Sequence, residues 1–238
     1  MATTFKTLVL DKDVANTRTM LHEAIPLTGT IVSGTYRDEN IKNYAHGMFQ
    51  SVYDYPYLSS SANHIFDLTV GYSSTSALSG TVPHVQQAKK INIYNQMAQV
   101  LVGYDVTGSI REFDQDGNFA AGGTKLKECV FINFSRLLTK DEIKKGSFIF
   151  TAVTGGTPSA PVGSLTISDY GATSTFLTNS PAGEYAVLYT GSEAVQGSGV
   201  GLLYYQAGIA VLTASYMSGA FGAGTFGAPT DVHSDIDA

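Results

Sequence analysis

The sequence has a single cysteine, Cys129, so no disulfide can form within the chain. Because Cys129 lies in the strand-like run CVFINF, we interpret it as a buried and unreactive thiol. Charged side chains are also scarce, at 14% of the residues against roughly 25% in an average soluble protein. Serine, threonine, glycine, asparagine and tyrosine replace them. Such an uncharged polar surface favours a protein that packs against neighbours, although many extracellular β proteins share it.

The sequence also lacks the features of nucleic-acid and membrane binding. The formal net charge is −6, and the lysine pairs at 89–90 and 144–145 stand alone, so there is no basic stripe and we expect no direct nucleic-acid partner. No apolar run approaches the roughly 18 residues of a membrane-spanning helix. No charged leader precedes the short apolar run near the N-terminus, so we expect no signal peptide and synthesis in a cytoplasm.

The clearest secondary-structure pattern lies between residues 184 and 215, where tyrosine, valine, leucine and isoleucine dominate and glycine supplies the breaks. Alternation predicts that Leu203 and Tyr205 share one face of a strand, and that Leu202 and Tyr204 share the other. Three strands are expected here, at 185–189, 202–205 and 209–213, with a turn at 206–208 and a flexible glycine-rich break at 197–201.

Helices are expected mainly before residue 104. Apolar residues at helical spacing predict an amphipathic helix over 41–53, and capping signals predict helices at 14–24 and 83–102, the last ending at Gly103. A capping box from Thr139 to Glu142 predicts a short helix that ends at Gly146. Further strands are expected at 27–36, 66–72, 128–134, 147–153 and 165–167, and the stretches 154–163 and 219–229 are expected to be irregular.

These elements predict an α+β fold with N-terminal helices plus strands and a C-terminal antiparallel, sandwich-like β sheet. The expected regions are a mixed helical and extended part at 1–104, a β-rich domain at 105–218 and a glycine- and alanine-rich irregular tail at 219–238.

The helix at 83–102 is expected to bury one face and to present the other to a partner protein. Its outer face is rich in amides and carries Gln86, Gln87, Lys90 and Gln96. The inner face is expected to hold Val85, Ala88, Ile91, Tyr94, Met97, Ala98 and Leu101.

One segment partly matches a calcium-binding loop. Asp114, Asp116 and Asn118 have the spacing of the first oxygen ligands, but that pattern also needs glycine at 119 and glutamate at 125. The sequence has Phe119 and Lys125 there, so we interpret Asp116-Gly117 as a turn and expect no metal.

Other site patterns are incomplete as well. The glycine-rich stretch 117–125 resembles a phosphate-binding loop, but Gly123 stands where the lysine should follow the second glycine. The glycines at 197–201 lack the dinucleotide-binding spacing. No nucleophile elbow or acidic pair for glycoside hydrolysis is evident. We therefore assign no catalytic, cofactor-binding or metal residue, and predict that the chain is not an enzyme. Five histidines lie far apart, without zinc spacing: His22, His46, His64, His84 and His233.

Three passages resemble virion structural proteins of tailed bacteriophages, in particular large contractile-tailed phages of marine bacteria. They are INFSRLLTKDEIKKGSFIFTAV (132–153), DYGATSTFLTNSPAGEYAVLYT (169–190) and GVGLLYYQAGIAVLTAS (199–215). The resemblance covers roughly the C-terminal half and includes no functional motif, so it implies no site residue.

This resemblance implies a structural subunit of the tail baseplate or neck, located in the virion, whose partners are other virion proteins and copies of itself. Two alternatives stay open at this point. One is a capsid-surface or fibre protein that binds a host receptor, and the other is a tail-associated hydrolase. The sequence has no fibre-like repeats and no polar constellation for hydrolysis.

Overall fold

A computed structural model describes residues 40–45, 47–80, 85–119, 122–135, 141–157, 160–190 and 199–216. Several predictions from the sequence lie outside these ranges. They are the helix at 14–24, the strand at 27–36, the tail at 219–238, residues 197–198 of the break at 197–201, and His22, His46, His84 and His233.

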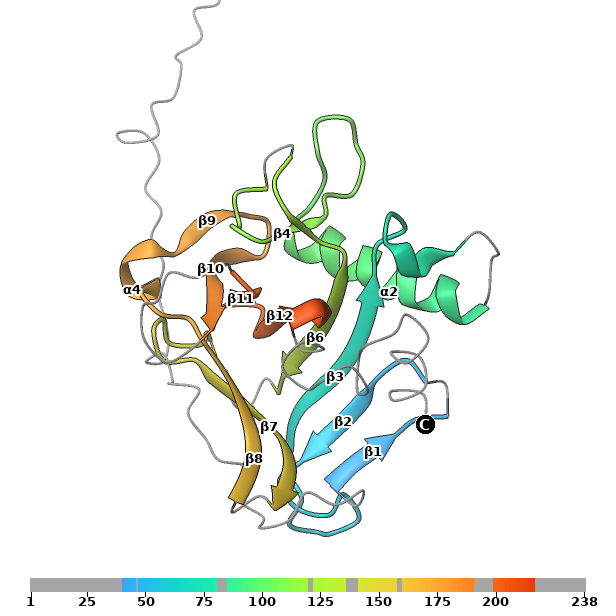
Figure 1. Ribbon diagram of the computed structural model, residues 1–238, viewed down its shortest axis with the longest axis vertical. Helices are drawn as coiled ribbons and strands as arrows, with labels where there is room; N and C mark the ends of the chain where they lie inside the picture. Colours follow the sequence, from blue (N-terminus) through green and yellow to red (C-terminus); the bar gives the residue numbers. More distant parts are fainter. Residues whose placement is uncertain are drawn as a thin grey trace, which may run out of the picture.

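The described residues form a largely β fold built on one antiparallel sheet of ten strands (Figure 1). The strand order is β1-β2-β3-β6-β12-β11-β10-β8-β7. Strand β9 lies off this path and pairs with β10 on the edge that faces away from β11. Strands from both sides of residue 104 therefore belong to one sheet. The strands are β1 (Ile41–Asn43), β2 (Gln50–Tyr53), β3 (His64–Tyr72), β6 (Glu128–Phe134), β7 (Ile149–Thr157), β8 (Ala160–Ser168), β9 (Leu177–Ser180), β10 (Gly183–Thr190), β11 (Gly201–Tyr204) and β12 (Ile209–Thr213).

Smaller elements surround this sheet. A two-stranded ladder joins β4 (Phe113–Asp114) to β5 (Lys125–Leu126). The helical segments of the described chain include α2 (Val85–Leu101), the single turn α4 (Ala172–Thr175), the 3-10 turn η2 (Ala77–Ser79) and a helical turn at 214–216 after β12.

The hairpin of β11 and β12 forms the centre of the sheet, as the sequence predicts. Leu202 pairs with Val211, and neither side chain is exposed. The pairing is so close that a Cβ on Gly201 would lie 2.2 Å from the carbonyl oxygen of Val211. The predicted alternation is confirmed, because Leu203 packs in one hydrophobic cluster and Leu202 in another.

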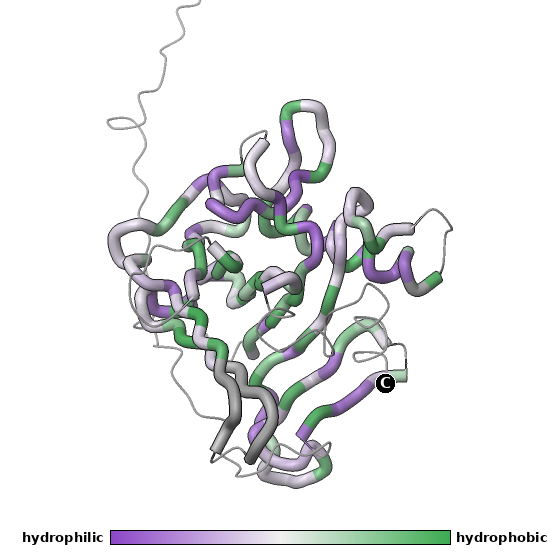
Figure 2. The backbone as a smooth tube through the Cα atoms, in the orientation of Figure 1, coloured by the Kyte–Doolittle hydropathy of each residue, from purple (hydrophilic) through white to green (hydrophobic). Residues whose placement is uncertain are grey.

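The two clusters lie on opposite faces of these central strands. The first, called here the β7-side cluster, includes Phe148, Leu165, Ile167, Leu188 and Leu203. The second, called the α2-side cluster, includes Tyr94, Leu101, Phe113, Phe131 and Val211. Figure 2 shows hydrophobic positions recurring along the strands between them. Because both faces are covered, the central strands read as almost continuous apolar runs.

Helix α2 ends as predicted, at Gly103 with φ +82°. Its orientation corrects the predicted faces, because Val85 and Ala88 are exposed whereas Lys90 is only 1% exposed. The reason lies in Gly71 of β3, where a Cβ would be 2.8 Å from the backbone nitrogen of Tyr94. The missing side chain lets the helix touch the sheet at this turn, which turns Lys90 inward. Its ammonium donates to the carbonyl oxygen of Gly47 at 3.5 Å.

The predicted helix at 41–53 is wrong, because this segment forms the hairpin of β1 and β2. Ile41 pairs with Val52, and Gly47 turns the chain with φ +61°. Strand β2 continues into β3 through a second antiparallel ladder. The apolar residues of 41–53 fit both a helical pattern and a pair of short strands. Pairing with the sheet decides in favour of the strands.

Two further predictions need correction. Much of the stretch 154–163, expected to be irregular, belongs to β7 and β8. Residues 141–146, expected to be helical, form turns. The reason is that the N–H of Ile143 donates to the carbonyl oxygen of Tyr205 at 3.0 Å, so the sheet takes the hydrogen bond that a helix would use. Thr139 lies outside the described residues.

Replacing Val211 with aspartate should prevent folding, because a carboxylate would enter the α2-side cluster without a partner. The expected cost is several kcal/mol, comparable with a total stability of roughly 5–15 kcal/mol. The matched control is Val106→Asp, because Val106 is 99% exposed. Soluble yield and thermal unfolding of both variants measure the difference. Equal behaviour of the two variants would show that β12 does not lie in the core.

Candidate functional site

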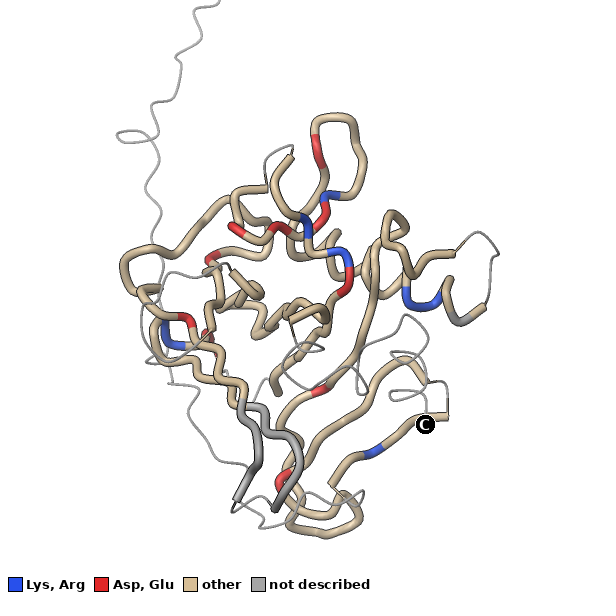
Figure 3. The backbone as a smooth tube through the Cα atoms, viewed as in Figure 1, with Lys and Arg blue, Asp and Glu red and all other residues tan. Residues whose placement is uncertain are grey.

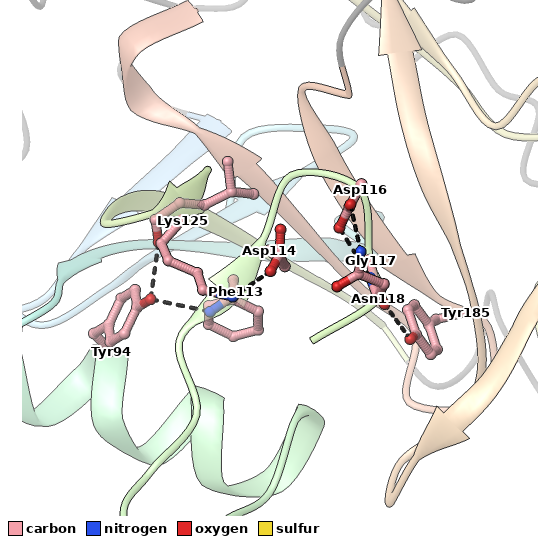
Figure 4. Close-up of polar contacts among 9 residues, drawn as sticks. Tyr94, Phe113, Asp114, Asp116, Gly117, Asn118, Lys125 and Tyr185 are labelled. Atoms are coloured by element: carbon pink, nitrogen blue, oxygen red, sulfur yellow. Dashed lines mark hydrogen bonds and ion pairs between the residues drawn. The ribbon is translucent and has the colours of Figure 1, made fainter. Parts of the chain in front are cut away.

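The main polar constellation lies where the β4–β5 ladder and its loop cover the α2-side cluster (Figure 4). Phe113 and Leu126 are buried and anchor the ladder. The Tyr94 hydroxyl on α2 donates to the carbonyl oxygen of Leu126 at 2.8 Å and accepts the N–H of Phe113 at 3.2 Å. One buried hydroxyl therefore fixes α2 to both strands of the ladder. Burial raises the pKa of Tyr94, which keeps the hydroxyl protonated.

Asp114 is the most deeply buried carboxylate of this constellation, with 1% of its side chain exposed. Its Oδ2 forms an ion pair with the ammonium of Lys125, whose side chain is 19% exposed. Its Oδ1 has no hydrogen-bond partner among the described residues. A Cβ on Gly123 would lie 3.3 Å from that oxygen, so the glycine lets the chain close over the carboxylate.

Asp116 and Asn118 form the turn beside this pair. The Asp116 carboxylate accepts the backbone N–H of Asn118 at 3.1 Å and its side-chain amide at 2.5 Å. The backbone hydrogen bond from Asn118 is the main cause that lowers the pKa of Asp116. The Tyr185 hydroxyl donates to the carbonyl oxygen of Gly117 at 2.6 Å, which joins the turn to β10. The predicted Asp-Gly turn is confirmed, with φ +73° at Gly117.

The structure explains how the loop differs from a calcium-binding loop. Phe119 has φ +55°, a left-handed conformation at the position where the calcium pattern has glycine. Lys125 occupies the position of the ligand glutamate, and its ammonium pairs with Asp114. The carboxylate thus already has a cation from the chain itself. Within the described ranges, no group of three or more histidine, cysteine, aspartate or glutamate residues is placed to hold a metal ion.

A second constellation brings together Ser51, His64 and Asp67, which sequence reasoning missed. The Ser51 hydroxyl donates to Asp67 Oδ1 at 2.5 Å, and His64 Nε2 lies 2.8 Å from the same oxygen. In a hydrolytic triad the imidazole lies between the hydroxyl and the carboxylate, so that it can take the hydroxyl proton. Here the carboxylate lies between the other two groups. The arrangement therefore does not activate Ser51 as a nucleophile. The pairing of β2 with β3 places Ser51 opposite Asp67, a register that the helix prediction concealed.

A third constellation surrounds Asp169, which is almost completely buried. Its carboxylate accepts the N–H of Gly146 at 2.7 Å, the N–H of Phe148 at 2.9 Å and the Tyr205 hydroxyl at 2.9 Å. Burial raises the pKa of this carboxyl, against the opposing effect of its hydrogen bonds. The three donors tie the turn before β7 to the end of β11, which is a structural role.

Lys145 lies over the ring of Tyr205, whose hydroxyl donates to Asp169. Its ammonium is 2.6 Å from Glu184 and 3.9 Å from Glu142, and it lies over the rings of Phe176 and Tyr205. Both charges of the closer pair are largely buried, so the contact stabilises the β7-side cluster rather than leaving a base or nucleophile available.

Cys129 is buried as predicted, and burial raises its pKa, so the thiol is protonated and unreactive. No helix of the described chain is long and apolar enough to cross a membrane. Family models, curated proteins and solved structures yield no match to this chain.

Replacing Lys125 with methionine should destabilise the fold by about 3–5 kcal/mol, because it leaves the buried Asp114 carboxylate without its cation. The double variant Asp114→Asn/Lys125→Met removes both charges and should recover most of this loss. Denaturant unfolding of the wild type, both single variants and the double variant gives the coupling free energy. Additive effects of the two substitutions would contradict the proposed pairing.

Proposed function

We propose that the chain is a structural subunit of a tailed-phage particle, in the tail baseplate or the neck. It acts by protein–protein assembly with other virion proteins and with copies of itself. The resemblance of 132–153, 169–190 and 199–215 to such proteins motivates the proposal, and the outer face of α2 supports it. The polar constellations described above serve the fold, so none of them favours hydrolysis.

The observation that carries the proposal is the outer face of α2, which combines aliphatic and amide side chains and has little charge. Helical spacing places Lys89 within this stripe, where it is half-buried, whereas Lys90 is buried. The cores of protein interfaces are likewise poor in charge. The exposed positions of this face are Val85, Ala88, Asn92, Gln96, Gln99 and Val100.

Exposed apolar side chains also lie on two loops outside this face. Leu58 in the β2–β3 loop is 87% exposed, and Val106 in the segment between α2 and β4 is 99% exposed. Tyr55 and Tyr104 are also exposed on these two loops. Figure 3 shows that charged positions are sparse along β1, β2 and β3 and more frequent in the segments between α2 and β6. Exposed apolar residues on several loops suit a subunit with more than one neighbour.

The proposal predicts that the chain is a stoichiometric component of the phage particle and is found with the tails. Particles of the phage that encodes it can be separated into capsids and tails, and each fraction analysed by quantitative mass spectrometry. The chain should appear in the tail fraction. Its absence from particles would contradict the proposal, and its presence only with capsids would favour a capsid-surface protein.

The same assay should show that the α2 face is needed. The variant Asn92→Glu/Gln96→Lys adds a favourable pair of opposite charges four residues apart, so it keeps the net charge and supports the isolated helix. Burying these charges in an interface is unfavourable, and incorporation into particles should fall severalfold.

The control variant is Ser60→Lys, an exposed position in the β2–β3 loop, away from α2. It should be incorporated like the wild type. Both variants should unfold at the wild-type temperature. Normal incorporation of the α2 variant would show that this face is not buried in the particle.

A further inference from the structure

The hairpin of β7 and β8 continues well past its short pairing with β10, as a long two-stranded ribbon (Figure 1). The two strands pair along their length, from Ile149 opposite Ser168 to Thr157 opposite Ala160. Strand β10 pairs with β8 only at Ser168 and Ile167. From Thr166 outward, the described chain therefore forms a ribbon of only two strands. Strand β7 is an edge, with β8 as its sole hydrogen-bonded neighbour in the described sheet.

The base of this ribbon is firmly held. Phe148, Leu165 and Ile167 are buried in the β7-side cluster. Between the buried Ile167 and Leu165 of β8, Thr166 faces the exposed Thr151 across the ladder, with their hydroxyl oxygens 3.4 Å apart. The core thus fixes the direction of a ribbon whose outer part makes no further strand pairing with described residues.

The ribbon lacks the charges that protect edge strands from pairing. Residues 147–168 contain no aspartate, glutamate, lysine, arginine or histidine. Natural edge strands usually carry charges, especially lysine, or proline. The prolines of this segment are Pro158, which follows β7 in the sequence, and Pro161 on β8, whereas β7 has none. The outer edge of β7 is therefore less protected against strand pairing than β8, which carries a proline.

A two-stranded ribbon is only marginally stable in water, and a third strand greatly strengthens it. We propose that the outer edge of β7 pairs antiparallel with β7 of a second copy of the chain, which joins two sheets across a two-fold axis. Because β7 carries no charge, two copies of it can pair in such a contact without placing like charges opposite each other. The chain as a whole carries a net charge of −6, so copies repel elsewhere, and this segment lets them approach without opposing like charges. The inference deepens the proposed function, because it names one contact between copies.

The test compares two lysine substitutions at facing positions of the same hairpin. Thr151→Lys places a charge on the edge strand, and Thr166→Lys places one on the inner strand of the ribbon. Light scattering and sedimentation measure the dimer dissociation constant of the full chain. We expect a wild-type dimer, a dissociation constant raised at least about tenfold by Thr151→Lys, and a much smaller effect of Thr166→Lys. Unchanged thermal unfolding would show that both variants fold.

A wild-type chain that stays monomeric at every accessible concentration would overturn the inference. Equal effects of the two substitutions would do the same, and a larger effect of Thr166→Lys would assign the contact to β8 instead. These results are independent of the particle assay. A monomeric chain found in the tail fraction would remove only the β7 contact, and a dimer absent from particles would remove only the proposed function.

Discussion

The fold depends on burial of the central strands on both faces. Tyr204 on β11 stacks on Tyr185 with 5.2 Å between the ring centroids, and Tyr185 stacks on Phe119 at the same separation. The next residue, Tyr205, points to the opposite face and reaches Asp169. Neither face of the hairpin can meet water, so both need a covering layer. Helix α2 and the β4–β5 loop cover one face, and the base of β7–β8 covers the other.

The buried polar groups follow from this constraint, because polar groups buried between a covering layer and the sheet need hydrogen-bond partners. Among the described residues, Asp114 Oδ1 and the Tyr204 hydroxyl are exceptions without such a partner. Tyr94 and Asp114 serve one side, and Asp169 serves the other. Burial raises the pKa values of Tyr94 and Tyr205, so these hydroxyls stay neutral and donate hydrogen bonds. Perturbed pKa values often mark catalytic sites. In this chain the raised pKa values of Tyr94, Tyr205 and Asp169 lie at contacts between layers.

Sequence reasoning succeeded where burial dictates the residue pattern. Strand β6 has the predicted bounds, and β12 and α2 lie where apolar periodicity and glycine placed them. It failed at 41–53, because a short hairpin and a helix can use the same apolar residues, and only pairing with β3 decides between them. Lys90 is a similar case. The glycine in β3 that turns this helical face inward lies far from it in sequence.

The polar constellations were predictable only within a single turn. Asp116 and Asn118 are two residues apart, so their turn could be read from the sequence. The contacts of Asp169 with Tyr205, and of Ser51 with Asp67, depend on strand register, which no local pattern reveals. Prediction of the function from the sequence has the same limit. The low-charge composition favours assembly, and the sequence predicts a partner face on the helix at 83–102. The residues that α2 exposes on that face, and the edge of β7, emerge only from the fold.

The central claim is that one doubly covered hairpin holds the whole sheet together. Native-state hydrogen exchange on the intact chain tests it most directly, because the slowest amides report global unfolding. Amides of β6, β11 and β12 should exchange last and with one common free energy, whereas those of β1 and the outer part of β7 should exchange much earlier. If the amides of β11 and β12 exchanged as fast as those of β1, the central hairpin would not be the core of the fold.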